Sequence, residues 1–233
     1  MHITALERPA SLVAEVCSRL SHLILGQAAR DESTWLPPER SLAQQLGVSR
    51  TVVREATKRL EQQGLLEIQH GTGIKIIRQL HRPLSDSLSL LLPDANARLR
   101  QLHQTRLAIE PAAAALAAEH ASTAQLEALR AAHTRLENAA SAEDAIEADL
   151  DWHHRIADAS GNAIFRLILD SLADLGRESR LRTVGRIGKV PAIAHHSRIQ
   201  AALETRDAAT AADSMREHIL AALHDMALED STR

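Results

Sequence analysis

The sequence predicts a mainly α-helical protein in two parts: a small N-terminal domain of helices with one β-hairpin, and a C-terminal all-helical bundle of about seven helices. Hydrophobic residues make up 45% of the 233 residues but aromatic residues only 1%, and the remaining apolar content, Ala and Leu, favours helices. Alternation typical of strands is confined to residues 65–77. Residues 1–82 carry 11 basic and 8 acidic side chains, whereas residues 83–233 carry 16 and 22. This asymmetry suggests two domains with different partners.

We expect the first domain at residues 1–77, a linker at 78–83 and the helical domain at 84–233. The single cysteine, Cys17, excludes an intrachain disulfide and fits a reducing compartment. Glu7 and Glu15 interrupt the apolar run that a signal peptide needs. No stretch of 18 apolar residues is present to span a membrane. We therefore expect a soluble cytoplasmic protein with no membrane partner.

Residues 11–25 have the spacing of a helix that Gly26 can end, and its expected apolar stripe is Leu12, Val16, Leu20 and Leu23. A second helix is predicted after Pro37 and Pro38, which suit a helix start because proline has no N–H to leave unpaired. Its expected buried stripe is Leu42, Ala43 and Leu46. Gly47 can end this helix in the left-handed conformation, and Ser49 is a suitable N-cap for the next one.

The helix expected from residue 50 has two distinct faces. The apolar face is formed by Val52, Val53, Ala56 and Leu60, and the opposite face by Arg50, Arg54, Thr57 and Glu61. A solvated basic face is the ordinary alternative for such charges. The order helix, three-residue turn, helix favours another interpretation, because it places the first residues of the second helix in the major groove of DNA.

A β-hairpin is predicted after Gly64, where Leu66 and Ile68 alternate in one strand and Ile74 and Ile76 in the next, with "GTG" at 71–73 as the turn. Helices followed by such a hairpin form a winged helix-turn-helix. His70 lies at the expected wing tip, where an ordinary exposed turn residue is the alternative.

Four motifs follow one another in the N-terminal part: "LPPER", "LGVSRTVVREA", "GLL" and "GTG". Together they resemble the DNA-binding domain of the GntR family of bacterial transcription regulators, over roughly residues 10–77. One departure is the longer, acidic segment "GQAARDESTWLP" before the second helix. The resemblance implies that operator DNA is contacted by the helix residues Arg40, Ser49, Arg50, Thr51 and Arg54, and by His70 and Gly71 of the wing.

The C-terminal part reads as helices at residues 84–92, 95–119, 122–139, 142–160, 162–182, 191–205 and 207–228, which together suggest a bundle. It contains no glycine-rich phosphate loop.

Asp149 and His153 lie four residues apart inside an apolar stripe. A buried carboxylate beside a buried imidazole is costly unless the two are paired or bound to a metal, so a simple Asp–His hydrogen bond is the alternative. His196 and His218 share the apolar faces of two further helices, so that the four side chains form a plausible divalent-metal set.

The C-terminal part carries several motifs: "RLAIEPAAAALAA" at 106–118, then "D...H" before "ASGN", then "H..I..AL" and "M..H". Taken together, these motifs resemble the FCD-type effector domain of the FadR-like branch of the GntR family. The resemblance covers residues 84–228 and implies a divalent metal (zinc, nickel or manganese) at Asp149, His153, His196 and His218. It also implies that Arg106 faces the effector cavity, with an i,i+4 salt bridge to Glu110 as the alternative. Asn162 is expected to cap the following helix.

The function predicted from these patterns is a metabolite-responsive transcription regulator that is not an enzyme. It binds double-stranded operator DNA as a homodimer, with Arg50 and Arg54 reading guanines, and responds to a small organic acid bound beside the metal, such as a hydroxy acid or sugar acid. One alternative is a helical metalloenzyme whose three-histidine, one-aspartate site activates water with Glu110 as base. Another is a structural DNA-binding protein without metal or effector.

Overall fold

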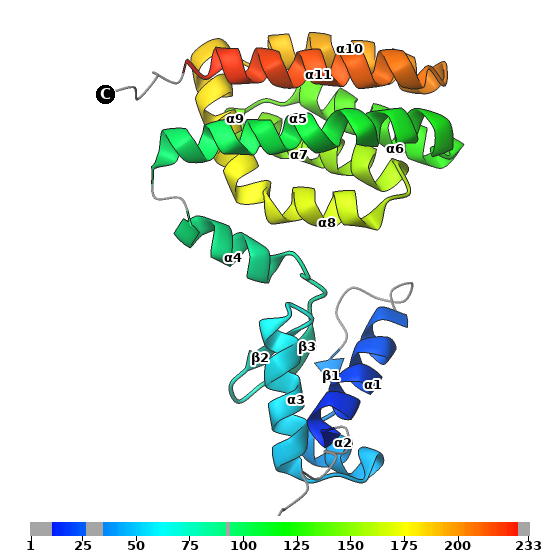
Figure 1. Cartoon of the computed structure of the whole chain (residues 1–233), viewed down its shortest axis with the longest axis vertical. Coiled ribbons are helices and arrows are strands. Elements are labelled where there is room, and N and C mark those ends of the chain that lie inside the picture. Colours follow the sequence, from blue (N-terminus) through cyan, green and yellow to red (C-terminus); the bar gives the residue numbers. More distant parts are fainter. Residues whose placement is uncertain (1–10, 27–34, 92–93, 228–233) are drawn as a thin grey trace, which may run out of the picture. The chain divides into compact units, whose positions relative to one another are not determined.

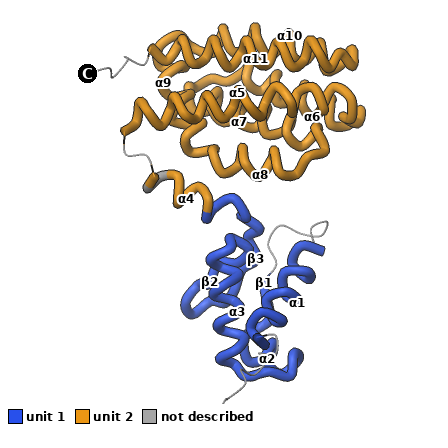
Figure 2. The backbone as a smooth tube through the Cα atoms, in the orientation of Figure 1, with its two compact units in different colours: residues 1–83 blue, residues 84–233 orange. Residues whose placement is uncertain are grey.

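The computed structural model describes residues 11–26, 35–91 and 94–227 (Figure 1). The chain divides into two compact units, residues 1–83 and 84–233 (Figure 2). The segment at 27–34, which carries most of the acidic departure from the family pattern, lies outside the described residues, as does Glu7. No helix within the described part of the chain is both long and apolar enough to cross a membrane.

Unit 1 is a winged helix-turn-helix, as predicted. Its elements are α1 (Leu12–Gly26), β1 (Trp35–Leu36), α2 (Glu39–Leu46), α3 (Arg50–Gln62), β2 (Leu66–Gln69) and β3 (Gly73–Ile76). The hairpin has antiparallel register, with Leu66 opposite Ile76 and Ile68 opposite Ile74. The strand β1 was not predicted; it pairs with the other edge of β3 to give the order β1-β3-β2. Two residues are too short to show alternation, so only pairing with β3 reveals this strand.

The turn between α2 and α3 has the predicted local chemistry. Gly47 adopts the left-handed conformation with φ 67° and ψ 29° at the end of α2. The Ser49 hydroxyl oxygen then accepts a hydrogen bond of 3.3 Å from the N–H of Val52. Together the two residues stop one helix and start the next within three residues, which sets the angle at which α3 leaves the turn.

Two predicted helix faces in unit 1 were wrong in detail. In α1 the buried side chains are Val13, Val16, Leu20 and Ile24, while Leu12 and Leu23 are 56% and 49% exposed. In α3 Thr57 is fully buried, because α3 packs against α1, α2 and β2 and is therefore covered over more than one stripe. The Thr57 hydroxyl donates to the carbonyl of Arg54 at 3.1 Å, which satisfies its hydrogen-bonding need in the core.

Unit 2 is all-helical in its described residues: α4 (Arg82–Leu91), α5 (Ala95–His120), α6 (Thr123–Asn138), α7 (Ala142–Ala159), α8 (Ala163–Ser171), α9 (Ala173–Ile187), α10 (Val190–Glu204) and α11 (Ala208–Asp225). The mainly helical class is confirmed, with two differences from the predicted elements. The helix α4 begins at Arg82, inside the segment expected to be a linker. The single helix predicted at 162–182 is two helices, with a break at Leu172 (φ −98°, ψ 3°).

The break at Leu172 has no local signal, because the segment "ILDSLADL" contains neither proline nor glycine. The tertiary structure supplies a partner there: the Ser85 hydroxyl of α4 donates to the carbonyl of Ser171 at 3.1 Å. Asn162 caps α8 as predicted, accepting a hydrogen bond from the N–H of Ile164.

Alanine side chains allow the long helix α5 to pack closely in the middle of unit 2. Its Ala113, Ala114, Ala117 and Ala118 are fully buried together with Trp152 of α7. The helix α5 packs against α7, α9, α10 and α11, and Figure 1 shows it passing between the α10–α11 pair and α7. Polar side chains that point inward from these helices therefore meet in one region.

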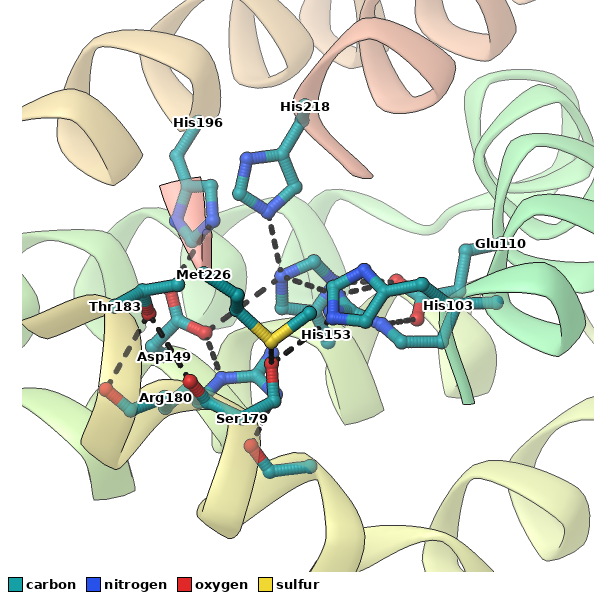
Figure 3. A network of polar contacts seen from close by, with 12 residues as sticks. His103, Glu110, Asp149, His153, Ser179, Arg180, Thr183, His196, His218 and Met226 are labelled. Atoms are coloured by element: carbon teal, nitrogen blue, oxygen red, sulfur yellow. Dashed lines mark hydrogen bonds and ion pairs between the residues drawn. The ribbon is translucent and has the colours of Figure 1, made fainter. Parts of the chain in front are cut away.

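One buried polar network links three of these helices (Figure 3). The Nε2 atom of His103 lies 2.9 Å from the Ser179 hydroxyl, and that hydroxyl donates to the Met226 sulfur at 3.3 Å. Burial lowers the pKa of His103 to about 3, and repulsion from Arg106 and Arg180 acts in the same direction. His103 is therefore a neutral hydrogen-bonding group in the folded protein at neutral pH.

This pKa predicts that acid destabilises unit 2 through His103. An unfolded histidine has a pKa near 6.5, so the unfolded chain binds the proton first, and stability is lost as the pH falls from about 6.5 toward 3. Between pH 6.5 and 5, His103 should account for a loss of roughly 1.5 kcal/mol, which His103→Gln lacks. Urea unfolding of chelator-treated protein, followed by Trp152 fluorescence in a Trp35→Phe background, measures this. Equal pH dependence of the two proteins would contradict the assignment.

Candidate functional site

Three buried histidines from three helices converge in the core of unit 2 (Figure 3). One ring nitrogen from each of His153 on α7, His196 on α10 and His218 on α11 lies within 4.8 Å of the others. Asp149, one turn before His153, has Oδ1 3.3 Å from Nε2 of His196 and Oδ2 3.7 Å from Nε2 of His153. The structure thus brings the four candidate ligands together, while their role as ligands stays a prediction.

The orientation of His153 is set by Glu110 of α5. Its Nδ1 lies 2.5 Å from Oε2 of Glu110; since a carboxylate can only accept, Nδ1 carries the proton. The lone pair is then on Nε2, which faces Nε2 of His218 at 3.2 Å. A carboxylate behind a histidine is the common outer support of a metal-binding imidazole, because it fixes the ring and raises the basicity of the free nitrogen.

His196 is a buried imidazole whose ring nitrogens lack hydrogen bonds in the described part of the chain. Among the described residues, none forms a hydrogen bond with either of its ring nitrogens, although Nε2 lies 3.3 Å from Oδ1 of Asp149. Its ring stacks on Trp152 with centroids 3.8 Å apart and planes at 10°, which holds it in place. A buried polar nitrogen without a hydrogen-bond partner is costly. A cation bound at Nε2 of His196 would supply the partner that this nitrogen lacks.

The protonation states also suit a cation. Burial lowers the pKa of His153, His196 and His218 well below the ordinary value, so all three are neutral near pH 7. Burial alone would raise the pKa of Asp149, but the Arg180 guanidinium and the neighbouring imidazoles of His196, His153 and His218 together outweigh this, and the net shift is downward. Neutral imidazoles and an ionised carboxylate are the forms in which these groups bind metals.

Sequence reasoning missed Arg180 of α9. Its Nε donates to Oδ2 of Asp149 and its Nη1 to the carbonyl of Gly176 at 3.1 Å. Arg180 lies in the segment predicted as one continuous helix, and nothing in its spacing marked it as inward-facing. The alternative of a simple hydrogen bond between Asp149 and His153 is not observed, since those side chains are 3.7 Å apart and Arg180 is the hydrogen-bonded partner.

Arg106 forms the salt bridge that was its alternative interpretation, with Nε 2.6 Å from Oε1 of Glu110. It belongs to the histidine cluster as well, because its Nη2 lies 3.5 Å from Nε2 of His153. Both partners are buried. Glu110 is thus shared between a guanidinium and an imidazole. Burial raises its pKa, but the charge and hydrogen bond of Arg106, together with Arg180 and His218, lower it further, so the net shift is downward.

A pocket with about 580 Å³ of empty volume opens beside the cluster. Its polar lining includes Arg106, Asp149, Arg180, His195 and His218, and most of the remaining wall is aliphatic. The arrangement offers two guanidinium groups to an anion and an apolar surface to its carbon skeleton.

The predicted DNA-contacting residues of unit 1 are all exposed: Arg40, Ser49, Arg50, Thr51, Arg54, His70 and Gly71. A groove with about 1030 Å³ of empty volume is lined by Arg40 of α2, Arg50 of α3 and both wing-tip residues. The Ser49 side chain is occupied in capping α3. The start of α3 and the tip of the wing therefore line the same groove, which is the arrangement needed to contact adjacent parts of one duplex.

Glu39, which sequence reasoning did not single out, holds Arg54. The guanidinium makes two hydrogen bonds to this carboxylate, Nε to Oε1 at 3.2 Å and Nη2 to Oε2 at 2.9 Å. The hydrogen bond from Arg54 lowers the pKa of Glu39 more than its slight burial raises it. Arg54 is thus held in a defined orientation on the surface of α3.

Comparison with known proteins agrees with this geometry. Residues 12–76 match the family described as bacterial regulatory proteins, gntR family, and residues 101–221, more than half of the chain, match the FCD domain. Among solved structures, Streptococcus agalactiae GntR superimposes with a TM-score of 0.73 at 27% identity, covering 91% of this chain and 99% of that one.

The related proteins are transcription regulators. LutR of Bacillus subtilis (strain 168) is 29% identical over 191 residues, which cover 77% of this chain and 85% of LutR. The Uxu operon transcriptional regulator of Escherichia coli (strain K12) is 38% identical over 55% of this chain and 51% of its own length. The repressor NanR of Citrobacter rodentium (strain ICC168) is 34% identical over 61% of this chain and 56% of its own. The match thus spans about half the length of the latter two relatives.

These relatives give no support to the metalloenzyme alternative. A winged helix with a groove that Arg40 and Arg50 line and a helical unit with a pocket beside a buried polar cluster fit such a regulator. The chain belongs to the GntR family of bacterial transcription regulators and carries an FCD domain as its second unit.

Proposed function

We propose that unit 2 binds a divalent metal through Asp149, His153, His196 and His218, that a small carboxylate binds beside it, and that this effector controls operator binding by unit 1. The observation that carries the proposal is the convergence of three buried neutral imidazoles, one of which has no hydrogen bond from the described residues. A purely structural DNA-binding protein has no use for so costly an arrangement.

Three nitrogen donors and one oxygen donor suit zinc, nickel or manganese. When bound, the metal would supply open coordination positions for an oxygen ligand. The chain itself supplies the rest of the recognition: Arg106 and Arg180 line the pocket, and a guanidinium fork matches a carboxylate. The small volume and aliphatic wall favour a short organic acid, most simply a hydroxy acid or sugar acid.

Operator binding is the function of unit 1, and a homodimer on two half-sites is the expected arrangement for a helix-turn-helix of this kind. The name of NanR as a repressor supports repression as the mode of action, and regulation of an operon, as in the name of the Uxu regulator, fits a cytoplasmic protein that responds to a metabolite. Binding of the effector should change operator affinity by about 1–3 kcal/mol, the usual coupling energy between two sites.

The first prediction from this function concerns the DNA surface. Arg50→Ala and Arg54→Ala should each weaken operator binding by about 1–3 kcal/mol and relax specificity at one base pair. Glu39→Gln should weaken binding less, because it removes the orienting carboxylate but keeps the guanidinium. Titration of labelled operator measures all three, with Arg130→Ala of unit 2 as control. Wild-type affinity in both arginine variants would show that α3 does not read the operator.

The second prediction concerns the metal. Elemental analysis of the purified protein should find zinc, nickel or manganese, and His153→Ala and His196→Ala should lose it, whereas the exposed His120→Ala should keep it. Chelation should lower the melting temperature, because a metal present at 100 times its Kd adds about 2.7 kcal/mol to stability. Unchanged metal content in both ligand variants would place the metal elsewhere.

The third prediction concerns the effector. In a thermal-shift screen with metal present, small hydroxy or sugar acids should stabilise the protein, and their neutral amides should not. Arg106→Lys keeps a positive charge for Glu110 but removes the planar fork, so it should lose most of this stabilisation. If only a long acyl chain or a neutral compound stabilises the wild type, the effector is not a small acid. If the acid binds Arg106→Lys equally well, Arg106 has no part in recognition.

A further inference from the structure

Asp149 is shared between two kinds of partner. Its Oδ1 faces Nε2 of His196 at 3.3 Å, while its Oδ2 accepts the hydrogen bond from Nε of Arg180. All three side chains are buried. The one carboxylate of the proposed ligand set is therefore already neutralised by a cation that belongs to the protein (Figure 3).

A metal ligated by Asp149 would lie close to this guanidinium. Zinc binds carboxylate oxygens at about 2.0–2.2 Å, so a divalent charge on Asp149 would come within a few ångströms of Arg180 in a site sheltered from water. Glu110 cannot relieve the repulsion, because Arg106 and His153 already use both of its oxygens. A metal held by Asp149 would thus leave the guanidinium of Arg180 buried without full compensation, which is strongly unfavourable.

An anion in the adjoining pocket would remove this cost. Arg180 lines both the pocket with about 580 Å³ of empty volume and a second pocket with about 280 Å³. Its Nη1 lies 3.2 Å from the position that a Cβ on Gly176 would occupy, so the absence of a side chain at residue 176 leaves room for the guanidinium. A carboxylate bound in the larger pocket could take the hydrogen bonds of Arg180 while Asp149 turns to the metal.

We propose that Arg180 competes with the metal for Asp149, so that metal and effector bind cooperatively. In the absence of effector, Arg180 holds Asp149 and weakens metal binding. A carboxylate effector engages Arg180 and frees Asp149 for the metal. By thermodynamic linkage the metal then raises the affinity for the effector by the same factor. This inference rests on the metal and carboxylate sites of the proposed function.

A different role for Arg180 predicts the opposite effect. If Arg180 only positioned Asp149 as a ligand, its removal would weaken metal binding, as loss of an outer support of a metal site commonly does by about 10–100-fold. Competition predicts that removal strengthens binding. The sign of the change in metal affinity therefore decides between the two roles.

The test is calorimetric titration of nickel into chelator-stripped full-length protein. Arg180→Met should bind nickel about tenfold or more tightly than wild type, a change of the size that groups around a metal site can produce. Arg177→Met is the matched control, because Arg177 lies on the same helix but pairs with Glu143 and Glu147 outside the cluster, and it should leave the affinity unchanged. Equal or weaker nickel binding by Arg180→Met overturns the inference.

Arg180→Gln controls for misfolding of the Arg180→Met variant, because the glutamine amide can still donate a hydrogen bond to Asp149 but carries no charge. The Arg180→Gln protein should also bind nickel more tightly than wild type. In a second titration, excess acetate serves as the simplest carboxylate. It should raise the nickel affinity of wild type more than that of Arg180→Met, because only wild type has to free Asp149 from Arg180. An equal increase in both proteins, or no effect on wild type, would overturn the part of Arg180 in the cooperativity.

His196→Gln separates this inference from the proposed function. Nickel bound by His196→Gln as tightly as by wild type would mean that the proposed metal site is wrong. Loss of nickel in His196→Gln together with an unchanged affinity in Arg180→Met would remove only the role of Arg180.

Discussion

The burial of ionised carboxylates in an alanine-rich helical core is the constraint on which unit 2 depends. Asp149 and Glu110 are both buried, and an isolated carboxylate there would be too costly to keep its charge. Each is therefore matched to a guanidinium, Arg180 for one and Arg106 for the other. These pairs come from α5, α7 and α9, so the relative positions of three helices are tied to charge compensation as well as to apolar packing.

The same pairing of guanidinium and carboxylate recurs in unit 1, with a different consequence. There Glu39 holds Arg54 at the surface, where solvent screens the interaction and its contribution to stability is small. Its effect is on orientation, and in the proposed function this matters because a planar fork fixed in advance loses less conformational freedom when it binds DNA. The two buried pairs of unit 2 therefore allow charged side chains to remain ionised inside the bundle. The exposed pair of unit 1 orients the Arg54 guanidinium, which in the proposed function contacts an anionic partner.

The failures of sequence reasoning have a common physical origin. The break at Leu172, the short strand β1 and the burial of Thr57 all lie at contacts with residues distant in the chain. Local propensity is evaluated for one segment at a time. It therefore predicts a continuous helix through "ILDSLADL" and an exposed position for the polar side chain of Thr57. It also cannot show which of two like side chains on one helix points inward, as with Arg177 and Arg180.

The sequence by itself determined the mainly helical class, the winged helix with its Gly47 and Ser49 turn, and the residue types of the candidate metal site, because periodicity, caps and ligand spacing are local properties. The convergence of His196 and His218 on Asp149 and His153 could be suspected only from shared apolar faces and family resemblance. The tertiary structure alone decided that Glu110 orients His153, that Arg180 holds Asp149 and that Glu39 holds Arg54. Those partners are separated by 43, 31 and 15 residues, so only the packing of the helices brings them within hydrogen-bonding distance.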